Sequence, residues 1–496
     1  MPRRVLLINP RMASRNSLRL PLSLLALGAA LEGRHDYQII DGNVDDDAIG
    51  TALRALDEAP HAAVGLTVMP GPQVGPAIAI SAAIRAAHPG VPIVWGGYFP
   101  TLYTSAAINA PYVDACARGP GEDTLLEFLK AGSAAGVPGL TWKNGNRIVH
   151  NPDRPLRGSD DYPPLPYDRL GDVGRYLRPS FLGARTAVHQ AAVGCRYHCA
   201  FCGVVSMFNG QTRLSRPARI AEAMRTLRDR YGATAIQFYD HNFFDREESS
   251  AEIVEAMAGV ALPWWCYARA DALAGFSDRT WALIQASKLR MAYIGAEAAS
   301  DSVLRSMKKG TTTEHTLEAA RRCRAHGVIP EFSFVLGGPE DPEGEIETTL
   351  AFIRRLKAIH PECEVILYFY SPTPQRDPRS ARGDGPRLPA LETYGPGGPA
   401  LPSTPEEWTE PRWIDYVCHR DAPWLNPRIR QHVRDFGRVL QCRFPTVQDV
   451  RTPAWGKAIL RAAASWRYAQ GRYDGPRELE WLRRMIPLRE PERESL

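Results

Sequence analysis

Residues 192–202 read AVGCRYHCAFC, and their cysteines, Cys195, Cys199 and Cys202, are spaced C-x3-C-x2-C. The triplet directly follows a predicted strand and a glycine. Thiolates favour soft metals, and three of them on a tight loop can hold three irons of a 4Fe–4S cube, which leaves the fourth iron open for a ligand. A zinc site completed by His198 or His241 is the alternative. Structural zinc sites normally use two separated ligand pairs, however, and the sequence has no second cysteine pair.

Strand and helix alternate around the triplet through residues 181–375. The predicted strands are Ala187–Val193, Ala235–Tyr239, Trp264–Ala268, Met291–Ile294, Glu331–Leu336 and Glu364–Phe369. The helices predicted between them include Pro217–Tyr231, Asp278–Ala286 and Thr313–His326. Six such units indicate a parallel α/β domain, either an open sheet or a partial (β/α)6 barrel.

Residues 1–150 show a second α/β pattern. The predicted strands are Val5–Ile8, Tyr37–Ile40, Ala63–Val68, Ile93–Trp95 and Val113–Ala117, with helices over Leu20–Leu31 and Ala77–Ala87. Turn residues separate the elements, as in Asn9-Pro10 and Gly96-Gly97. In a parallel sheet of this kind, ligands bind at the carboxyl ends of the strands, where these loops lie.

The remaining segments connect or extend the two α/β units. Residues 151–180 contain Pro163-Pro164-Leu165-Pro166 and are predicted to be a linker. Residues 376–405 are rich in Pro and Gly and are predicted to form a long loop or lid. Residues 406–496 are predicted to be helical, with helices over Arg428–Gln441, Gly456–Gln470 and Arg477–Met485 and a frayed tail after Pro487.

Composition narrows the class of protein. Lys and Arg number 60 against 55 Asp and Glu, and a net charge of +5 over 496 residues gives no support for nucleic-acid binding. Nine cysteines, three of them clustered, do not form the even framework of a secreted disulfide protein. No apolar run resembles a signal peptide or reaches the roughly 18 residues of a membrane span. We therefore expect a reduced, cytoplasmic protein.

The motifs that follow the triplet resemble those of the radical S-adenosylmethionine (radical SAM) superfamily. Its cluster motif is C-x3-C-x2-C, and four further segments agree in order. They are Gln237-Phe238-Tyr239-Asp240-His241-Asn242-Phe243, Arg269-Ala270-Asp271, Gly295-Ala296-Glu297 with Asp301–Thr311, and Phe334-Val335-Leu336-Gly337-Gly338-Pro339. In the segment Gln237–Phe243, His241 replaces an acid of the family motif. In the segment that begins at Gly295, Ala298-Ala299 replace the usual Ser-Gly.

This resemblance implies a 4Fe–4S cluster on Cys195, Cys199 and Cys202, with S-adenosylmethionine on its open iron. The cofactor-binding residues would be Phe201, Tyr239, Arg269, Glu297, Gly337 and Gly338. Phe201 would lie against the adenine, Glu297 would contact the ribose, and the glycine pair would let the backbone approach the ligand. Asp240 and His241 are the candidate catalytic residues. A solvated Glu297 and a packed His241 are the alternatives.

The first domain resembles the cobalamin-binding domain fused to many enzymes of this superfamily. The motifs are Leu7-Ile8-Asn9-Pro10, Gly65-Leu66-Thr67, Trp95-Gly96-Gly97-Tyr98-Phe99-Pro100-Thr101 and Gly119-Pro120-Gly121-Glu122-Asp123-Thr124. The resemblance implies that the cobalamin contacts Pro10, Thr67, Gly96, Gly97 and Glu122. The D-x-H-x-x-G signature, whose histidine ligates cobalt, is absent. Cobalamin would then bind without a lower histidine, or the domain would be only a scaffold.

Together the two resemblances imply a cobalamin-dependent radical SAM methyltransferase. A 5′-deoxyadenosyl radical would activate an unactivated carbon of a biosynthetic intermediate, which takes a methyl group from methylcobalamin. The first alternative is a cyclase or rearrangement enzyme of the same family, with or without cobalamin. The second is a non-enzymatic cobalamin- or metal-binding regulator. A methylthiotransferase is disfavoured, because only Cys116 precedes Cys195 and the last residues resemble helices rather than a β-barrel.

The expected partners are a small-molecule or lipophilic substrate and an external one-electron reductant, flavodoxin or ferredoxin. No nucleic acid and no transmembrane segment are expected. Six tryptophans lie among arginines after residue 400: Trp408, Trp413, Trp424, Trp455, Trp466 and Trp481. They are interpreted either as the core of a helical domain or as a face for a substrate or a peripheral membrane contact.

Overall fold

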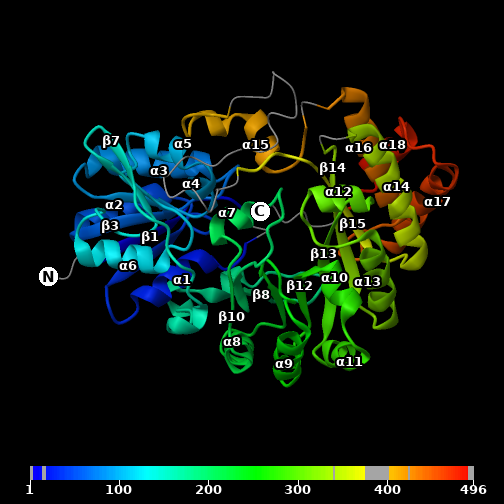
Figure 1. Cartoon of the computed structure of the whole chain (residues 1–496), viewed down its shortest axis with the longest axis horizontal. Coiled ribbons are helices and arrows are strands. Elements are labelled where there is room, and N and C mark those ends of the chain that lie inside the picture. Colours follow the sequence, from blue (N-terminus) through cyan, green and yellow to red (C-terminus); the bar gives the residue numbers. More distant parts are fainter. Residues whose placement is uncertain (1–3, 14–17, 339–340, 375–400, 423–424, 490–496) are drawn as a thin grey trace.

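The computed structural model contains two α/β domains and a helical C-terminal region (Figure 1). It describes residues 4–13, 18–338, 341–374, 401–422 and 425–489. The N-terminal domain lies at one end, the second α/β domain in the middle, and the last helices at the other end. This arrangement confirms the fold class expected from the sequence.

The N-terminal domain is built on a seven-stranded sheet of order β2-β1-β3-β4-β5-β6-β7. Its strands are β1 (Arg4–Asn9), β2 (Tyr37–Asp41), β3 (His61–Thr67), β4 (Ile93–Gly96), β5 (Ala115–Ala117), β6 (Leu140–Asn144) and β7 (Arg147–His150). The first five are parallel, as predicted, whereas β6 and β7 are an antiparallel addition. The helices are α1 (Leu22–Leu31), α2 (Ala48–Glu58), α3 (Val74–Ala87), α4 (Tyr98–Leu102), α5 (Thr104–Asn109) and α6 (Glu122–Ala131).

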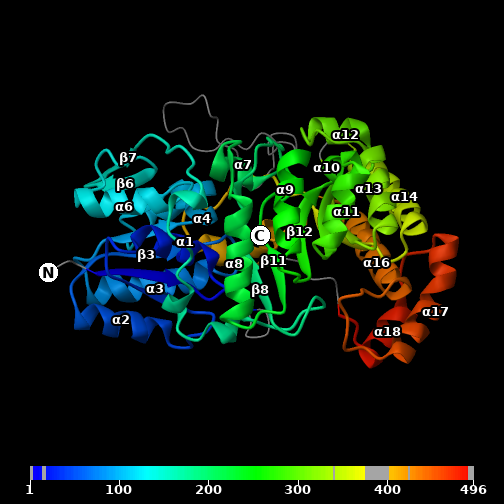
Figure 2. The same cartoon turned by 90° about the horizontal axis from the view of Figure 1, so that it is seen from below.

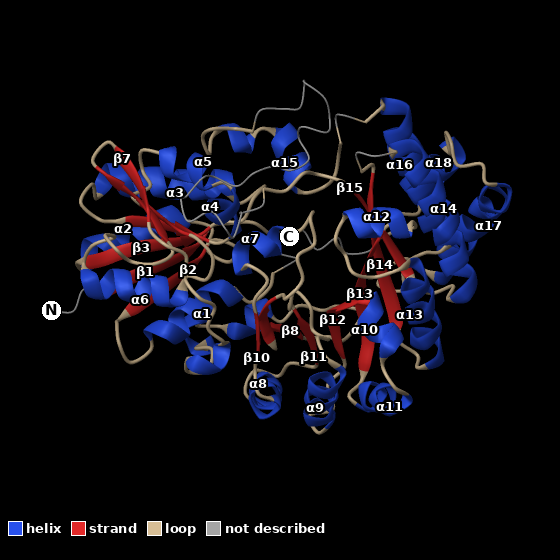
Figure 3. Cartoon of the chain, viewed as in Figure 1, coloured by secondary structure: helices blue, strands red, loops and turns tan. Residues whose placement is uncertain are grey.

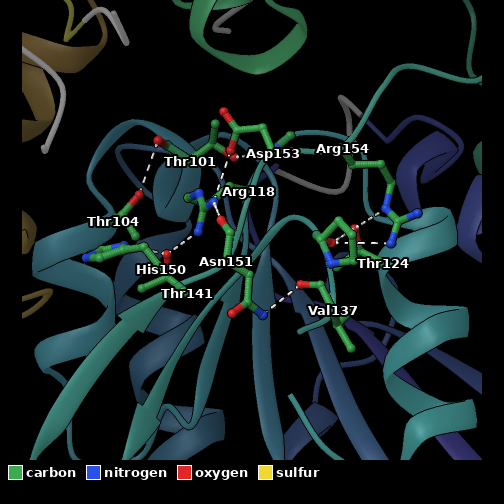
Figure 4. Close-up of polar contacts among 12 residues, drawn as sticks. Thr101, Thr104, Arg118, Thr124, Val137, Thr141, His150, Asn151, Asp153 and Arg154 are labelled. Carbon is green, nitrogen blue, oxygen red and sulfur yellow. Dashed lines mark hydrogen bonds and ion pairs between the residues drawn. The ribbon is translucent and has the colours of Figure 1, made fainter. Parts of the chain in front are cut away.

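A buried arginine joins the added hairpin to the parallel strands (Figure 4). The guanidinium of Arg118, which follows β5, donates hydrogen bonds to Thr141 Oγ1 of β6 and to the carbonyl of Asn151 beyond β7. It also lies 3.0 Å from a carboxylate oxygen of Asp153. These contacts hold in place the start of the loop after β5, which contains the predicted ligand-binding motif Gly119–Thr124.

The second domain contains six parallel strands in chain order, β15-β14-β13-β12-β11-β8, and helices cover their outer side (Figure 3). The strands are β8 (Thr186–His189), β11 (Ala235–Phe238), β12 (Trp264–Arg269), β13 (Leu289–Glu297), β14 (Ile329–Leu336) and β15 (Glu364–Phe369). The helices are α8 (Pro217–Asp229), α9 (Glu247–Ala258), α10 (Ala270–Gly275), α11 (Asp278–Ala286), α12 (Asp301–Ser306), α13 (Thr313–Ala325) and α14 (Pro342–Ile359). The result is the partial barrel that the sequence predicts.

One strand prediction is wrong. The segment Ala187–Val193 is not one strand, because the chain turns after His189. Its second part becomes β9 (Ala192–Gly194), which pairs antiparallel with β10 (Thr212–Leu214) in a separate hairpin. Asp240 explains the break, since its carboxylate accepts the backbone N–H groups of Ala191 and Ala192. The hairpin carries the cysteine loop and the short helix α7 (Gly203–Phe208).

The C-terminal region has two separate locations (Figures 1 and 2). The turn Glu407–Thr409 and α15 (Pro411–Val417) pack on the N-terminal domain, where the Trp408 ring centroid lies 4.1 Å from that of Tyr103. Helices α16 (Pro427–Arg443), α17 (Ala454–Gln470) and α18 (Arg477–Met485) form the opposite end of the molecule. The tryptophans therefore divide, because Trp408 and Trp413 are buried while Trp455, Trp466 and Trp481 are exposed.

Several expectations concern residues outside the described ranges. Most of the predicted loop 376–405, Trp424, Pro339 and the end of the tail after Pro487 belong to them. Residues 151–180, predicted to be a linker, contain three 3-10 turns and no α-helix or strand. No described helix is both long enough and apolar enough to cross a membrane.

Candidate functional site

A large cavity lies between the two α/β domains. Its volume is about 980 Å³, at the upper end of the roughly 300–1,000 Å³ of small-molecule sites. The N-terminal domain contributes the ends of β1, β3 and β4 and the loop before α6, while the second domain contributes residues after β8 and β11 and part of α7. The carboxyl ends of two parallel sheets thus face one space, as ligand sites in α/β folds require.

The cysteine loop runs from the end of β9 to the start of α7. Gly194 precedes it with φ +84°, and a Cβ there would lie 2.2 Å from the carbonyl oxygen of Gln211, just before the paired strand β10, so only glycine fits. Burial raises the pKa of the Cys195 thiol, and it raises the pKa of Cys202 to about 12. Among the described residues, no three His, Cys, Asp or Glu side chains are grouped so as to hold a single metal ion.

Two buried cations lie beside the cysteine loop. The Nζ of Lys309 is 2.6 Å from Glu297 Oε1 and 5.8 Å from the ring centroid of Phe201. The guanidinium carbon of Arg269 lies 3.6 Å from the ring centroid of Tyr197, and Arg269 also pairs with Asp271. Burial lowers the pKa of Lys309, but the charges of Glu297 and Cys199 and the hydrogen bond to Glu297 together outweigh it, and the net shift is upward. Both side chains therefore stay charged and favour negative charge on the thiols.

Glu297 ends β13 in an unusual conformation. Its φ is +62°, in the left-handed region that a residue with a Cβ seldom adopts. Its side chain is buried, and Lys309 is its ion-pair partner. A Cβ on Gly295 would lie 2.1 Å from Glu297 Oε1, so the glycine of this motif makes room for the carboxylate. Glu297 is therefore a paired, buried acid rather than the solvated one considered as its alternative.

The two candidate catalytic residues have different surroundings. Asp240 is fully buried, and its oxygens accept backbone N–H groups of Ala191 and Ala192; burial raises its pKa to about 7. His241 lines the cavity, and its Nε2 lies 3.2 Å from Tyr98 Oη of the N-terminal domain. Burial lowers the pKa of His241 to about 4, so the imidazole is neutral at pH 7. The structure places His241, not Asp240, at the cavity.

The glycine loops of the N-terminal domain border the cavity with Gly96, Gly97 and Gly119. Gly97 has φ +95°, and a Cβ there would lie 3.0 Å from the Val68 carbonyl oxygen, which explains the second glycine of the pair. The Thr101 hydroxyl donates to the Gly97 carbonyl and accepts the Gly119 N–H at 3.0 Å. One threonine therefore holds the two loops together.

Thr67, Glu122 and Tyr239 also line the cavity. Burial raises the pKa of Glu122, which begins α6. Pro10 is not among the lining residues; its carbonyl accepts a hydrogen bond from the Gln73 side chain, while the neighbouring Asn9 does reach the cavity. The Tyr239 hydroxyl accepts a hydrogen bond of 3.1 Å from Arg19 Nε, a second polar link between the two domains.

The remaining predicted cofactor-binding residues lie outside this cavity. Phe201 packs against a small cluster that contains Met307, Val335 and Tyr370. A Cβ on Gly337, whose φ is +79°, would lie 2.4 Å from Leu425 Cδ1, so a side chain of the C-terminal region packs directly against this glycine. The Gly338 N–H donates to Glu345 Oε2 at 3.2 Å. The glycine pair is therefore accounted for by packing and by this hydrogen bond.

Sequence reasoning missed three residues at the centre of the site: Tyr98, Lys309 and Arg19. Tyr98 and Lys309 lie inside motifs recognised in the sequence, so their positions within those motifs could have identified them as candidate site residues. Arg19 lies outside those motifs, and nothing in its local sequence marks it. Its role depends on a contact across 220 positions of the chain.

The donor sets suit the cofactors expected from the sequence. Three thiols on one loop beside two buried cations provide soft anionic ligands for an iron–sulfur cluster and charge to balance it. The glycine loops border the large cavity with backbone rather than with bulky side chains. A broad, flat ligand can therefore approach that edge of the sheet closely.

Comparisons with protein families match both domains. The radical SAM superfamily profile matches residues 190–353, and the B12 binding domain profile matches residues 9–129. An uncharacterized methyltransferase of Pyrococcus horikoshii is 25% identical over 343 residues, 68% of this chain and 73% of that protein. The anaerobic magnesium-protoporphyrin IX monomethyl ester cyclase of Cereibacter sphaeroides is 24% identical over 333 residues, 64% of this chain and 53% of that protein.

Solved structures share the fold along most of the chain. The radical S-adenosylmethionine methyltransferase TsrM of Kitasatospora setae, with cobalamin and a [4Fe-4S] cluster bound, has a TM-score of 0.61 and 18% identity and covers 98% of this chain and 99% of its own. The cobalamin-dependent S-adenosylmethionine radical enzyme OxsB has a TM-score of 0.62 and 20% identity, covering 74% of this chain and 53% of that one.

Proposed function

This chain joins a B12-binding domain to a radical SAM domain, and from that premise we propose that it is a cobalamin-dependent radical SAM C-methyltransferase. The observation that carries the proposal is the cavity between the domains, bordered by the glycine loops of one and by His241 of the other. A cobalamin held by the glycine loops of the first domain would face the strand ends of the radical SAM domain without a change of domain arrangement.

When bound, the cluster and S-adenosylmethionine would supply a 5′-deoxyadenosyl radical, and cobalamin would supply a methyl group. The protein would contribute position and charge. Cys195, Cys199 and Cys202 would hold the cluster, with Arg269 and Lys309 balancing its charge. Phe201, Glu297, Tyr239, Gly337 and Gly338 remain the proposed surroundings of S-adenosylmethionine. In the N-terminal domain, Thr67, Gly96, Gly97, Glu122 and the Pro10 turn would surround cobalamin.

His241 would act on the substrate as a neutral imidazole. Because its pKa is lowered to about 4, it can accept or donate a hydrogen bond at pH 7 without carrying charge. Tyr98, within 3.2 Å, would set which nitrogen of the ring faces the cavity. Asp240 would be a positioning residue, since it fixes the turn that leads from β8 to the cysteine loop.

A cyclase or rearrangement activity is the second candidate, supported by the relationship to the cyclase of Cereibacter sphaeroides. The test is an anaerobic incubation of the reconstituted protein with a one-electron reductant, a small-molecule extract of the source cells and methyl-labelled S-adenosylmethionine. A methyltransferase would form S-adenosylhomocysteine together with 5′-deoxyadenosine and would place the label in a product. Formation of 5′-deoxyadenosine without S-adenosylhomocysteine would favour the cyclase and reject the methyltransferase.

A further inference from the structure

Helices α17 and α18 expose an unusual number of large apolar side chains. Six of the eight large apolar side chains that are exposed among the described residues lie between positions 450 and 485. They are Val450 (75% exposed), Trp455 (63%), Ile459 (43%), Trp466 (49%), Trp481 (62%) and Met485 (69%). Scattered exposed apolar residues need no explanation, but five on two adjacent helices, with Val450 shortly before the first of them, mark an interaction surface.

The apolar side chains are aligned along each helix. On α17, Trp455, Ile459 and Trp466 follow one another at intervals of four and seven residues, so they lie along one side. A neighbouring side of the helix, with Gly456, Leu460 and Ala464, is buried. On α18, Trp481 and Met485 are four residues apart and exposed, while Leu479 is buried.

The two helices run antiparallel and share an outer surface. A Cβ on Gly456, near the start of α17, would lie 2.8 Å from Ile486 Cγ2 at the end of α18. At the other end, Arg467 Nη2 donates to Glu478 Oε2 at 2.9 Å. Helix α16 covers the inner side of α18 through Arg438, which contacts Glu480 at 2.6 Å. The pair forms the end of the molecule away from the N-terminal domain (Figures 1 and 2).

The segment that forms this surface is also strongly basic. Residues 450–489 contain nine Arg or Lys against three Asp or Glu, a net charge of +6, whereas the whole chain carries only +5. Arg451, Arg461 and Arg484 are exposed, and none of them forms an ion pair with another described residue. The excess positive charge of the protein is therefore concentrated in the segment that carries the exposed apolar residues.

We propose that the outer face of α17 and α18 docks the protein on a membrane that contains anionic phospholipids. Tryptophan rings favour the boundary between head groups and acyl chains, and amphipathic helices with basic flanks lie in that plane. Arginines within a Debye length of an anionic surface add attraction. A second copy of this chain is disfavoured as the occupant, because a two-fold contact through this face would bring two excess charges of +6 together. The proposal is independent of the proposed enzymatic activity.

The test is co-sedimentation of the full chain with phosphatidylcholine vesicles, with and without phosphatidylglycerol. We expect binding only when phosphatidylglycerol is present, and weaker binding at higher salt. The pair Arg461→Gln and Arg484→Gln should weaken binding by about fivefold for each arginine. The pair Trp455→Ala and Trp481→Ala should weaken it by roughly tenfold or more. All four side chains are exposed, so the thermal unfolding temperature should not change.

Arg147→Gln with Ile148→Ala is the matched control, because both residues are exposed on β7 of the other domain. This control should bind vesicles like the unmodified chain. Failure of the unmodified chain to bind anionic vesicles would overturn the proposal, as would variants that bind unchanged. The unmodified chain could instead fail to bind vesicles but self-associate, with self-association lost in the tryptophan variant. That result would assign the face to a second copy of the chain.

Discussion

Tyr98 of the N-terminal domain and His241 of the second domain meet at the cavity, with 3.2 Å between Tyr98 Oη and His241 Nε2. The tyrosine follows the glycine pair Gly96-Gly97, and the histidine follows β11. The loop expected to contact cobalamin and the strand expected to serve the radical reaction are thus directly linked. Residues 143 positions apart define one site.

Replacing Tyr98 by phenylalanine should lower the rate of product formation by about fivefold. This is the effect of losing one hydrogen bond worth roughly 1 kcal/mol. The His241 ring keeps its contact with Phe208 at 5.0 Å between centroids, so the variant should fold. Tyr103→Phe is the matched control, since Tyr103 is a buried tyrosine that stacks on Trp408 instead. Equal rates in the two variants would contradict a role for Tyr98 in positioning His241.

Lys309→Met should destabilise the protein by roughly 3 kcal/mol, because it leaves Glu297 buried without its cation. The double variant Lys309→Met with Glu297→Gln should recover most of that loss. Urea unfolding of the protein without cofactors measures both values. A double variant that is as unstable as the sum of the single ones would mean that the two residues act separately.

Asp240 should make stability depend on pH. Its pKa is about 7 in the folded protein and about 3.9 in an unfolded chain. Between these values the folded state binds the extra proton, so the free energy of unfolding should fall as pH rises from about 4 to about 7. Asp240→Asn removes the titrating group. The difference in unfolding free energy between the unmodified protein and this variant should therefore decrease over that range, and a constant difference would refute the assignment.

Trp408→Ala should loosen the N-terminal domain. Trp408 is buried among Phe99, Tyr103 and Trp413, and truncation of a buried tryptophan costs about 3–5 kcal/mol. Limited proteolysis should cut the variant faster than the unmodified chain. Trp481→Ala provides the control, because its side chain is exposed and its loss removes little packing. Equal digestion of the two variants would show that the Trp408 contact does not stabilise the N-terminal domain.

The sequence predicted the fold well where pattern and period determine it. All five parallel strands of the first domain and the six-strand barrel follow from apolar runs between turn residues. The break after His189 could not be foreseen, since it depends on hydrogen bonds that Ala191 and Ala192 donate to Asp240, about fifty residues away in the chain. The β6–β7 hairpin was missed because its strands are short and partly exposed, without a strong apolar run.

The candidate site was predicted less completely. The cysteine spacing and the Gly96-Gly97 pair can be recognised directly in the sequence. The different positions of Asp240 and His241 cannot be recognised in this way, because the side chains of neighbouring residues at a strand end point in different directions. The packing of Leu425 against Gly337 likewise depends on a C-terminal segment, and no local sequence pattern predicts where that segment lies.

The cysteine assignment can be tested by Cys199→Ser after anaerobic reconstitution with iron and sulfide. We expect the variant to lose bound iron and 5′-deoxyadenosine formation while it remains folded. Cys323→Ser, at a buried cysteine on α13, should keep both. Retention of 5′-deoxyadenosine formation by the Cys199 variant would reject the cluster site.

The most direct test of the central claim is the content of iron and cobalamin per chain, measured after anaerobic purification with both supplied. A radical SAM enzyme that uses cobalamin predicts about four irons, as in one 4Fe–4S cube, together with about one cobalamin. Iron without cobalamin would contradict the account. It would leave the N-terminal domain as a scaffold and make a radical cyclisation or rearrangement the better explanation.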